Sequence, residues 1–232
     1  MIRTLEPELV DELPADHPGA IDSRRDLRLL NTLMGHAGIF VRSLEKIFPN
    51  QPPSRILEIG AGDGQLLLRI AQCLPTNWRN LDVTLVDLQN LLVDETIAEF
   101  AALNWRVRSV ESDIFDWLNN SSEQSDVVLA NLFLHHFNHD QLSLLFSTLA
   151  KRTNAFIAVE PRRSRWPLFC AQMLSFIGCN AVTCHDAPVS VRAGFKGREL
   201  STLWPRDGEW EITERRAGLF SYLFVAHRKS GT

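Results

Sequence analysis

The sequence predicts an α/β fold in which a mainly parallel sheet carries helices on both faces. From Arg55 onward, short apolar segments alternate five times with longer amphipathic segments, a pattern typical of a doubly wound sheet. The C-terminal part reads instead as two strands around a tight turn at Ala217–Gly218, which indicates an antiparallel hairpin. The strand order does not follow from this pattern.

Two helical or extended segments precede the sheet. Residues 1–20 carry three prolines and one glycine among acidic residues, so we expect an extended, poorly packed lead-in. Residues 21–50 read as a helical N-terminal cap, in which Asp22 or Ser23 begins a first helix and Ile39–Phe48 forms a second. The main domain then covers residues 54–230, with a substrate lid around residues 162–205.

Each element of the main domain is expected where the periodicity changes. The expected strands are Ile56–Ile59, Val83–Val86, Val107–Val110, Val127–Ala130, Phe156–Val159 and the hairpin strands Trp210–Arg216 and Phe220–Ala226. The expected helices are Gln65–Leu74, Leu91–Leu103, a short turn around Phe115–Leu118, and Gln141–Ala150.

Composition excludes several classes of protein. The 232 residues are 45% hydrophobic and 22% charged, which excludes a disordered chain or a small disulfide scaffold. A net charge of −4 argues against nucleic acid or a membrane as partner, and the acidic N-terminus resembles no signal peptide. The four cysteines form no C-x-x-C pair, so we expect no metal site and a reducing, cytoplasmic location.

The sharpest motif is a glycine-rich loop after the first expected strand, Glu58-Ile-Gly-Ala-Gly-Asp-Gly64. Glycines at these positions allow a sharp turn and a close approach of a ligand to the backbone. A dinucleotide fingerprint needs its third glycine at position 65, which is Gln65, and no Gly-Lys-Ser/Thr follows for a phosphate-binding loop. The loop therefore indicates a different nucleoside ligand.

Polar residues end the next three strands: Asp87, Asp113 and Asn131. Ligands of doubly wound sheets bind at the carboxyl ends of the strands, and a carboxylate at Asp87 can accept hydrogen bonds from both hydroxyls of a ribose. Each acid alone is more often a helix cap. Their joint placement favours a ligand site.

In these motifs the sequence resembles the class I S-adenosylmethionine-dependent methyltransferases over about residues 54–228. The resemblance implies a seven-stranded Rossmann-like sheet of order 3-2-1-4-5-7-6 with strand 7 antiparallel, and S-adenosylmethionine as cofactor, leaving as S-adenosylhomocysteine. It implies that the loop faces the methionine part, that Asp87 binds the ribose, and that Asn131 lies at the sulfonium side. The implied cofactor contacts are Glu58, Gly60, Ala61, Gly62, Gly64, Asp87, Leu88, Asp113, Ile114 and Asn131.

A narrower similarity, in segments such as Glu160-Pro-Arg-Arg163 and Val189–Phe195, is to bacterial small-molecule methyltransferases of polyketide or phenolic-lipid biosynthesis. It implies a role in secondary metabolism. The acceptor that it implies is a small molecule, free or carrier-bound, and the protein is expected to be a monomer or homodimer.

Candidate catalytic residues follow the fourth strand in Leu134-His-His-Phe-Asn-His139. A histidine titrates near neutral pH and is suited to deprotonate a phenol or enol, so His135 or His136 is the candidate base. The alternative is that both shape the loop and that catalysis works by proximity alone. Glu160 either orients a histidine or binds the acceptor, or is a solvated strand end.

Candidate substrate residues lie in and around the expected lid. Arg162, Arg163 and Arg165 can grip a carboxylate, a phosphate or an acidic carrier protein, or form a solvated loop. His185 with Asp186 is a possible second acid–base pair, and Arg192 lies in a segment expected to be flexible. The apolar stretch Trp166–Ile177 would suit an aromatic or lipid-like acceptor.

Three functions from different classes remain open at this point. The first is O-methylation of a phenolic or polyketide-like small molecule. The second is methylation of protein or nucleic acid, against which the acidic balance and the absence of an Asn/Asp-Pro-Pro-Tyr-type motif after Asn131 argue. The third is a non-catalytic cofactor-binding subunit that regulates a partner.

Overall fold

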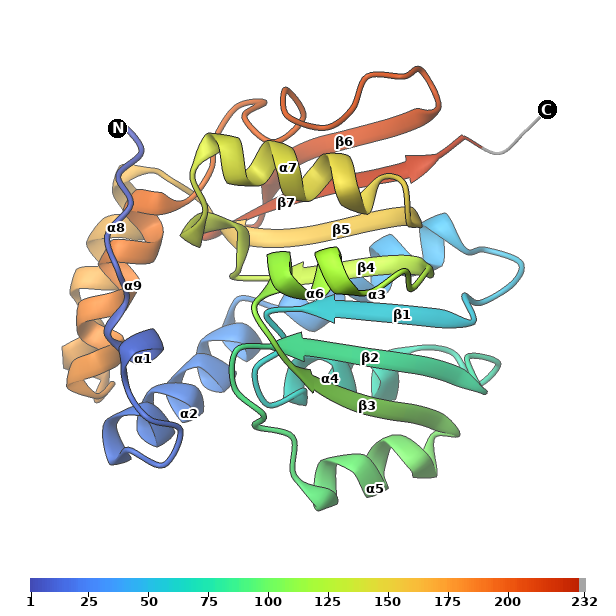
Figure 1. Ribbon diagram of the computed structural model, residues 1–232. Coiled ribbons are helices and arrows are strands. Elements are labelled where there is room, and N and C mark those ends of the chain that lie inside the picture. Colours follow the sequence, from blue (N-terminus) through green and yellow to red (C-terminus); the bar gives the residue numbers. More distant parts are fainter. Residues whose placement is uncertain (230–232) are drawn as a thin grey trace.

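A seven-stranded sheet forms the centre of the computed structural model, which describes residues 1–229 (Figure 1). Its strand order is β3-β2-β1-β4-β5-β7-β6, and β7 runs antiparallel to both β5 and β6. The predicted fold class and strand order are therefore confirmed; residue 230, the last of the predicted domain, lies outside the described residues. The strands are β1 (Arg55–Ile59), β2 (Leu81–Asp87), β3 (Trp105–Glu111), β4 (Ser125–Asn131), β5 (Thr153–Pro161), β6 (Trp210–Ala217) and β7 (Ser221–Arg228).

Helices cover both faces of the sheet because its central strands are apolar on both sides. Helices α3 (His36–Ile47), α4 (Gln65–Cys73) and α5 (Asp94–Ala102) pack on one face, where Phe40, Leu67 and Phe100 enter the core. Helices α6 (Ile114–Asn120) and α7 (His139–Leu149) pack on the other, around Phe146 and Trp204. The short 3-10 helix η1 (Leu134–His136) lies between β4 and α7.

A third group of helices lies beyond the carboxyl ends of the parallel strands, at the left of Figure 1. It comprises α1 (Leu9–Glu12), α2 (Pro18–Leu33), α8 (Arg165–Gln172), the 3-10 helix η2 (Leu174–Ile177) and α9 (Ala181–Ala193). Helix α9 contacts α1, α2, α8 and η1. The N-terminal segment and the segment after β5 thus meet over the edge of the sheet where ligands of this architecture bind.

The prediction for the N-terminus was wrong in part. Residues 1–8 are extended and mostly exposed, as expected, but the lead-in also contains α1 and is held on the rest of the molecule by side chains such as Arg3 and Glu8. Helix α2 begins at Pro18, not at Asp22 or Ser23, because proline suits the first turn and the His17 side chain accepts a hydrogen bond from Gly19 N–H.

The prediction for the lid was also incomplete. Residues Ala181–Ala193, which include Arg192 of the segment expected to be flexible, form a regular helix despite Pro188 in its interior. The side chain of Asn180 begins this helix by accepting hydrogen bonds from Val182 and Thr183 N–H. No helix among residues 1–229 is long and apolar enough to cross a membrane.

Candidate active site

The glycine loop leaves β1 with a left-handed backbone and passes directly under an aromatic ring. Gly60 has φ of +64°, and a Cβ there would meet the ring of Phe133 at 2.2 Å. Only glycine combines that conformation with that contact. A Cβ on Gly62, by contrast, would meet nothing within 4 Å, so the turn of the loop borders open space.

Asp87 joins this loop to the end of β2. Its Oδ2 accepts a hydrogen bond from Gly62 N–H at 2.8 Å, and its Oδ1 accepts one from Gln89 N–H at 3.1 Å. Burial raises the pKa of Asp87 above its ordinary value even though these bonds favour the carboxylate. The predicted ribose acid therefore lies against the predicted loop.

Glu58 is the buried acid beneath the same loop. Its Oε2 has no hydrogen-bond partner among the described residues. Burial, with the nearby charges of Asp63 and Asp87, raises its pKa to about 8. Asp63 is paired with Arg28 of α2 at 2.5 Å. The loop is thus surrounded by carboxyl groups, an environment suited to a ligand that carries hydroxyl donors and positive charge.

The remaining predicted cofactor residues lie along the same edge. Asp113 caps α6, its Oδ1 accepting hydrogen bonds from Phe115 N–H and Asp116 N–H. Ile114 is buried beside it, whereas Leu88 is exposed directly after Asp87. An exposed leucine next to a ribose-type acid provides an apolar surface for a base.

Asn131, at the end of β4, is bound to the helical N-terminal cap. Its Oδ1 lies 2.7 Å from His36 Nδ1, and His36 Nε2 lies 2.8 Å from Ser221 Oγ on β7. Burial lowers the pKa of His36 to about 4, so the ring is neutral and bridges an acceptor to a donor. Helix α3 is thereby held on the ends of β4 and β7.

Glu160 organises the histidine turn after β4. Its Oε1 accepts hydrogen bonds from Phe133 and Leu134 N–H, and its Oε2 lies 2.8 Å from His135 Nδ1. Glu160 is fully buried, so the alternative of a solvated strand end is wrong. Of the two roles expected for this acid, the structure shows the orienting contact to a histidine.

The other nitrogen of His135 faces a residue of the N-terminal segment. Glu8 Oε1 lies 3.1 Å from His135 Nε2 and accepts a hydrogen bond from Ser190 Oγ of α9 at 2.5 Å. We call residues 1–13 the N-terminal arm. Arg3 of this arm also donates hydrogen bonds to the carbonyls of Ala193 and His135.

The two carboxylates determine the protonation of His135. Burial alone would lower its pKa, but the hydrogen bonds and charges of Glu160 and Glu8 raise it to about 10. The same contact outweighs the burial of Glu8, whose pKa falls to about 2. His135 is therefore a buried imidazolium between two carboxylates at neutral pH.

His136 has the opposite electrostatics. Burial and the positive charge of His135 lower its pKa to about 4, and its Nδ1 lies 3.4 Å from Asp11 Oδ2. Burial and the charge of Glu8 raise the pKa of Asp11 to about 7. The two neighbouring histidines thus differ in charge, and His136 is neutral and accessible.

The predicted substrate residues do not converge. Arg163 is buried and donates to the carbonyls of Gly194 and Met1 and to Glu199, so its prediction as a substrate contact was wrong. Arg162 donates to the carbonyl of Leu219 near the β6–β7 turn. Arg192 is half-buried on the last turn of α9.

His185 and Asp186 do contact each other, at 2.8 Å, but Asp186 has another task. Its two oxygens accept hydrogen bonds from Leu9 and Val10 N–H at 2.8 and 3.0 Å. The side chain therefore caps α1 and holds the N-terminal arm on α9. The structure gives this pair a structural role rather than that of a second acid–base pair.

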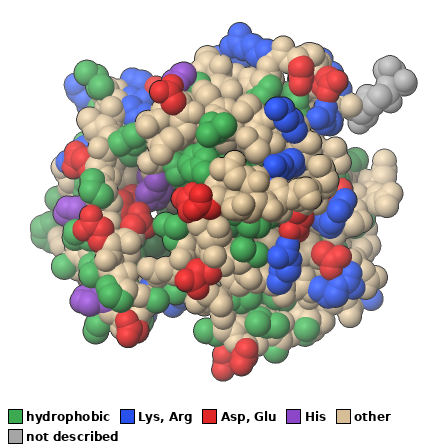
Figure 2. All heavy atoms as spheres, in the orientation of Figure 1, with side chains coloured by type: hydrophobic (Ala, Val, Ile, Leu, Met, Phe, Trp, Pro, Cys, Tyr) green, Lys and Arg blue, Asp and Glu red, His purple; other side chains and the backbone are tan. Residues whose placement is uncertain are grey.

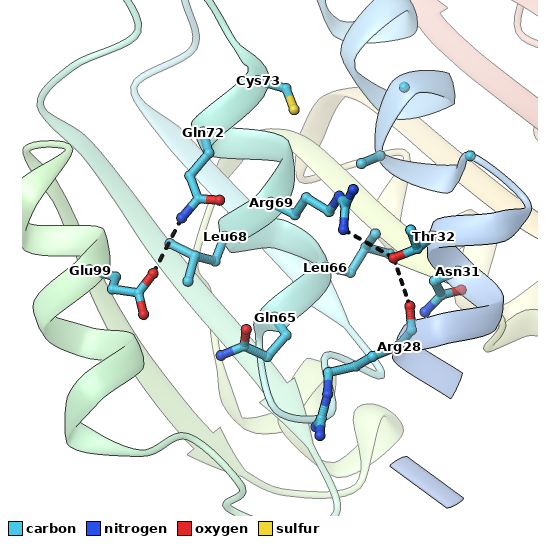
Figure 3. A pocket seen from close by; sticks show the side chains of 13 residues that line it. Arg28, Asn31, Thr32, Gln65, Leu66, Leu68, Arg69, Gln72, Cys73 and Glu99 are labelled. Atoms are coloured by element: carbon cyan, nitrogen blue, oxygen red, sulfur yellow. Dashed lines mark hydrogen bonds between the residues drawn. The ribbon is translucent and has the colours of Figure 1, made fainter. Parts of the chain in front are cut away.

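A cavity of about 540 Å³ lies beside the glycine loop, between α2 and α4 (Figure 3). Thr32 connects its walls by accepting a hydrogen bond from Arg69 and donating one to the carbonyl of Arg28. None of the residues predicted for cofactor, catalysis or substrate lines it. The predicted cofactor and catalytic residues lie instead at the carboxyl ends of strands β1 to β5 and in the segments that directly follow them.

Sequence reasoning missed Glu8, Asp11 and His36. The two acids lie in a proline-rich acidic segment that carries no local signal of burial, and their partners are more than 100 residues away. His36 lies between Gly35 and an apolar helix, where only its position at the start of α3 distinguishes it. Motif spacing could not identify any of them.

Comparison with known proteins identifies the domain. A family model described as "Methyltransferase domain" matches residues 56–154, which run from β1 to the start of β5. No curated protein matches the sequence.

Solved structures share the fold over most of the chain. The plantazolicin methyltransferase BpumL, in complex with a desmethylPZN analog and SAH, is 17% identical, with a TM-score of 0.66 and coverage of 93% of this chain and 91% of that chain. An O-methyltransferase family protein from Burkholderia thailandensis is 18% identical, with a TM-score of 0.58 and coverage of 94% and 64%. Magnesium protoporphyrin IX methyltransferase from Synechocystis PCC 6803, with bound SAM, is 16% identical, with a TM-score of 0.56 and coverage of 89% and 84%.

Proposed function

We propose that this chain is a class I S-adenosylmethionine-dependent methyltransferase and that it methylates a hydroxyl oxygen of a small-molecule acceptor, of phenolic or polyketide-like type. The observation that carries the proposal is the buried pair Glu160–His135 at the carboxyl ends of β4 and β5. A hydroxyl must lose its proton to attack a methyl group, and an oriented histidine is the usual acceptor of that proton.

The residues at the glycine loop fit S-adenosylmethionine, which supplies an electrophilic methyl group when bound. Its ribose hydroxyls match the Asp87 carboxylate at the end of β2, which lies against the loop. Glu58 Oε2, buried without a partner, is the atom that such a ligand would satisfy. Gly60, Ala61, Gly62 and Gly64 would lie along the methionine part, Leu88, Asp113 and Ile114 around the adenine, and Asn131 beside the sulfonium.

His135 acts at its Nε2 atom in this proposal. Glu160 holds Nδ1–H, which fixes the orientation of the ring, and Nε2 is the atom that Glu8 occupies. The acceptor hydroxyl takes the place of Glu8 Oε1, and the loss of that carboxylate lowers the pKa of His135 from the high value that two carboxylates produce, so that the Nε2 proton leaves to solvent and the ring becomes neutral. Nε2 can then accept the hydroxyl proton.

His136 is the second candidate for the base, because it is already neutral at pH 7. Its low pKa makes it a weak proton acceptor, however, and no carboxylate orients it as closely as Glu160 orients His135. We therefore assign it to the wall of the acceptor site. Arg192 and His185 remain candidates for acceptor contacts near the arm.

The test uses the full chain with methyl-labelled S-adenosylmethionine and a panel of small phenols, enols and polyketide-like hydroxy compounds. Protein and RNA serve as parallel acceptor pools. We expect label in the hydroxy compounds, with the product shown by mass spectrometry and NMR to carry an O-methyl group. Label only in protein or RNA, or none in any pool despite cofactor binding, would contradict the proposal.

Nitrogen is the alternative acceptor atom, because carboxylates gather around the arm. Glu8, Asp11 and Asp186 all contact this region and would stabilise an ammonium group. Primary and secondary amines therefore belong in the same panel. N-methylated product without O-methylated product would decide for this alternative.

A further inference from the structure

Helix α8 and the following η2 present their large apolar side chains to solvent. Trp166 is 57% exposed, Phe176 81% and Ile177 63%, and Phe169 and Met173 are also exposed. These five residues recur at helical spacing, and the rings of Trp166 and Phe169 stack at 5.9 Å. We call Trp166, Phe169, Met173, Phe176 and Ile177 the α8 apolar patch.

The orientation of this segment is the reverse of an ordinary amphipathic surface helix. This segment buries Pro167, Ala171 and Leu174. The side chains that it exposes include the aromatic rings of Trp166, Phe169 and Phe176. A helix on the outside of a protein normally buries its large apolar residues. Contiguous exposed apolar side chains of this size mark an interaction surface.

The patch does not face the candidate active site. Helix α8 packs on α9, and it is α9 that contacts η1, where His135 and His136 lie. Figure 1 shows α8 on the side of α9 away from the sheet. The apolar stretch that the sequence predicted as a wall of the acceptor site therefore points, with these five residues, to the outside of the molecule.

The charge around the patch is positive, in contrast to the net charge of the whole chain. Residues 161–185 contain three arginines and no aspartate or glutamate, whereas the chain carries −4. Arg165 is exposed at the start of α8. Lys196 is also exposed. Its Nζ and Arg163 Nη1 both donate a hydrogen bond to the carbonyl of Met1, which places Lys196 near the start of α8. Figure 2 shows basic and hydrophobic side chains next to each other at the upper left of this face of the molecule, with acidic side chains below them.

Acids that contact this region are already neutralised or bound. Glu199 pairs with Arg163, and Asp26 of α2 accepts hydrogen bonds from Asn180 N–H and Nδ2. Lys196 and Arg165, which directly precedes Trp166, are exposed basic residues, and both lie close enough to the Met1 ammonium to lower its pKa. Exposed aromatic side chains flanked by basic residues are the pattern of a surface that inserts into the interface of an anionic bilayer.

We propose that the α8 apolar patch, with Arg165 and Lys196, docks this methyltransferase peripherally on anionic lipid. The aromatic and aliphatic side chains enter the headgroup region while the basic residues contact lipid phosphates. The net charge of −4 argues against a membrane partner, but it is a sum over the whole chain and does not describe the local charge of this surface. The inference does not depend on the acceptor, because it rests on a surface outside the candidate active site.

Trp166 provides a direct reporter. The other five tryptophans of the chain are buried, so a change of fluorescence on binding reports the environment of Trp166. The probe is a set of vesicles of phosphatidylcholine with 30% phosphatidylglycerol, compared with phosphatidylcholine alone. We expect a blue shift and quenching by brominated lipid with anionic vesicles, and at least tenfold weaker binding to neutral ones or at high salt.

Variants separate the apolar and the charged contributions, with vesicle sedimentation as a second readout. Phe169→Ser with Phe176→Ser, and separately Arg165→Glu, should each weaken sedimentation at least fivefold. Trp166→Phe should lose the fluorescence change but keep sedimentation. Leu144→Ser, a change at a leucine of α7 that is also 57% exposed, is the matched control and should bind as wild type.

Three results would overturn the proposal. The first is no binding to anionic vesicles, and the second is equal binding to neutral ones. The third is a wild-type dimer in analytical ultracentrifugation that protects Trp166 from iodide and is broken by the Phe169→Ser/Phe176→Ser variant. That last result would assign the patch to a second copy of the chain. None of these measurements involves methyl transfer, so failure here leaves the proposed function untouched.

Discussion

The two halves of the candidate active site are built in different ways. On the cofactor side, the central hydrogen bond joins Gly62 to Asp87, which are 25 residues apart and belong to consecutive strand–loop units. On the acceptor side, Glu8 reaches His135 over 127 residues, and Asp186 holds Leu9 over 177. The cofactor side is therefore a local motif, whereas the acceptor side exists only after the N-terminal arm has folded onto η1 and α9.

The two halves also differ in whether their buried carboxyl groups have a charged partner. At the loop, Glu58 is buried without a partner, and its raised pKa of about 8 keeps it protonated at pH 7. At the histidine turn, Glu8 has a pKa of about 2 because His135 compensates it. Glu58 Oε2 has no hydrogen-bond partner among the described residues and is open to a ligand. Glu8, in contrast, is paired with His135 and thereby holds the N-terminal arm in place. Four changes test this contrast, in order of expected effect.

The largest effect is expected at His135. In His135→Asn the amide can still donate a hydrogen bond to Glu160, but no imidazole remains to accept the acceptor proton. We expect kcat to fall by about 10²–10⁴-fold with unchanged affinity for S-adenosylmethionine. Steady-state kinetics and calorimetry measure the two quantities. His139→Ala, at the exposed histidine of the same segment, is the control; near-full activity of both His135→Asn and His136→Ala would mean that catalysis is positioning alone.

The next effect concerns the cofactor side alone. Asp87→Ala removes a carboxylate acceptor for two ribose hydroxyls, and we expect binding of S-adenosylmethionine to weaken by about 2–4 kcal/mol. Calorimetry with the cofactor and with S-adenosylhomocysteine measures it. Asp82→Ala, at the exposed opposite end of β2, should bind as wild type. Equal affinities of the Asp87 variant and wild type would remove Asp87 from the site.

A pH-dependent effect should distinguish Glu58 from the compensated acids. Because the folded state raises its pKa from 4.5 to about 8, Glu58 contributes stability below pH 4.5 that is lost as pH rises through 8. Glu58→Gln carries no such titration, so without cofactor its free energy of unfolding should rise by about 4 kcal/mol relative to that of wild type between pH 5 and 9. Urea unfolding at several pH values measures the difference, and a constant difference would contradict the pKa.

The smallest effect is expected where the arm meets α9. Asp186→Ala removes the two hydrogen bonds to Leu9 and Val10 N–H, with an expected cost of about 1 kcal/mol of folding stability and faster proteolysis of the arm. The arm touches the cofactor side only where Gln89 Nε2 donates to the Leu13 carbonyl, among the contacts of the described residues. Asp186→Ala does not remove that hydrogen bond, so affinity for S-adenosylmethionine should not change. Asp140→Ala, at an exposed aspartate of α7, is the control. A loss of cofactor affinity in Asp186→Ala would show that the two halves are coupled.

The sequence predicted the sheet well because its signals are local. Alternation of apolar and amphipathic segments located every strand to within three residues at either end, and the glycine turn at Gly218 marked the hairpin. Helix α9 was not predicted because its apolar residues do not lie on one helical face and because Pro188 interrupts the sequence pattern of a helix. Arg163 was misjudged because a charged residue in a basic segment reads as exposed, whereas its guanidinium is buried and donates hydrogen bonds to the carbonyls of Gly194 and Met1 and to Glu199.

The sequence by itself determined the α/β class, the glycine loop and the acid at the end of β2, because these depend on residues close together along the chain. Only the tertiary structure decided which histidine is charged, since that depends on Glu160 and Glu8 reaching the same ring from opposite directions. It alone also decided that the apolar residues of α8 face outward, because periodicity gives the spacing of a helical face but not its direction. Burial and long-range charge are properties of the folded chain, and no local pattern encodes them.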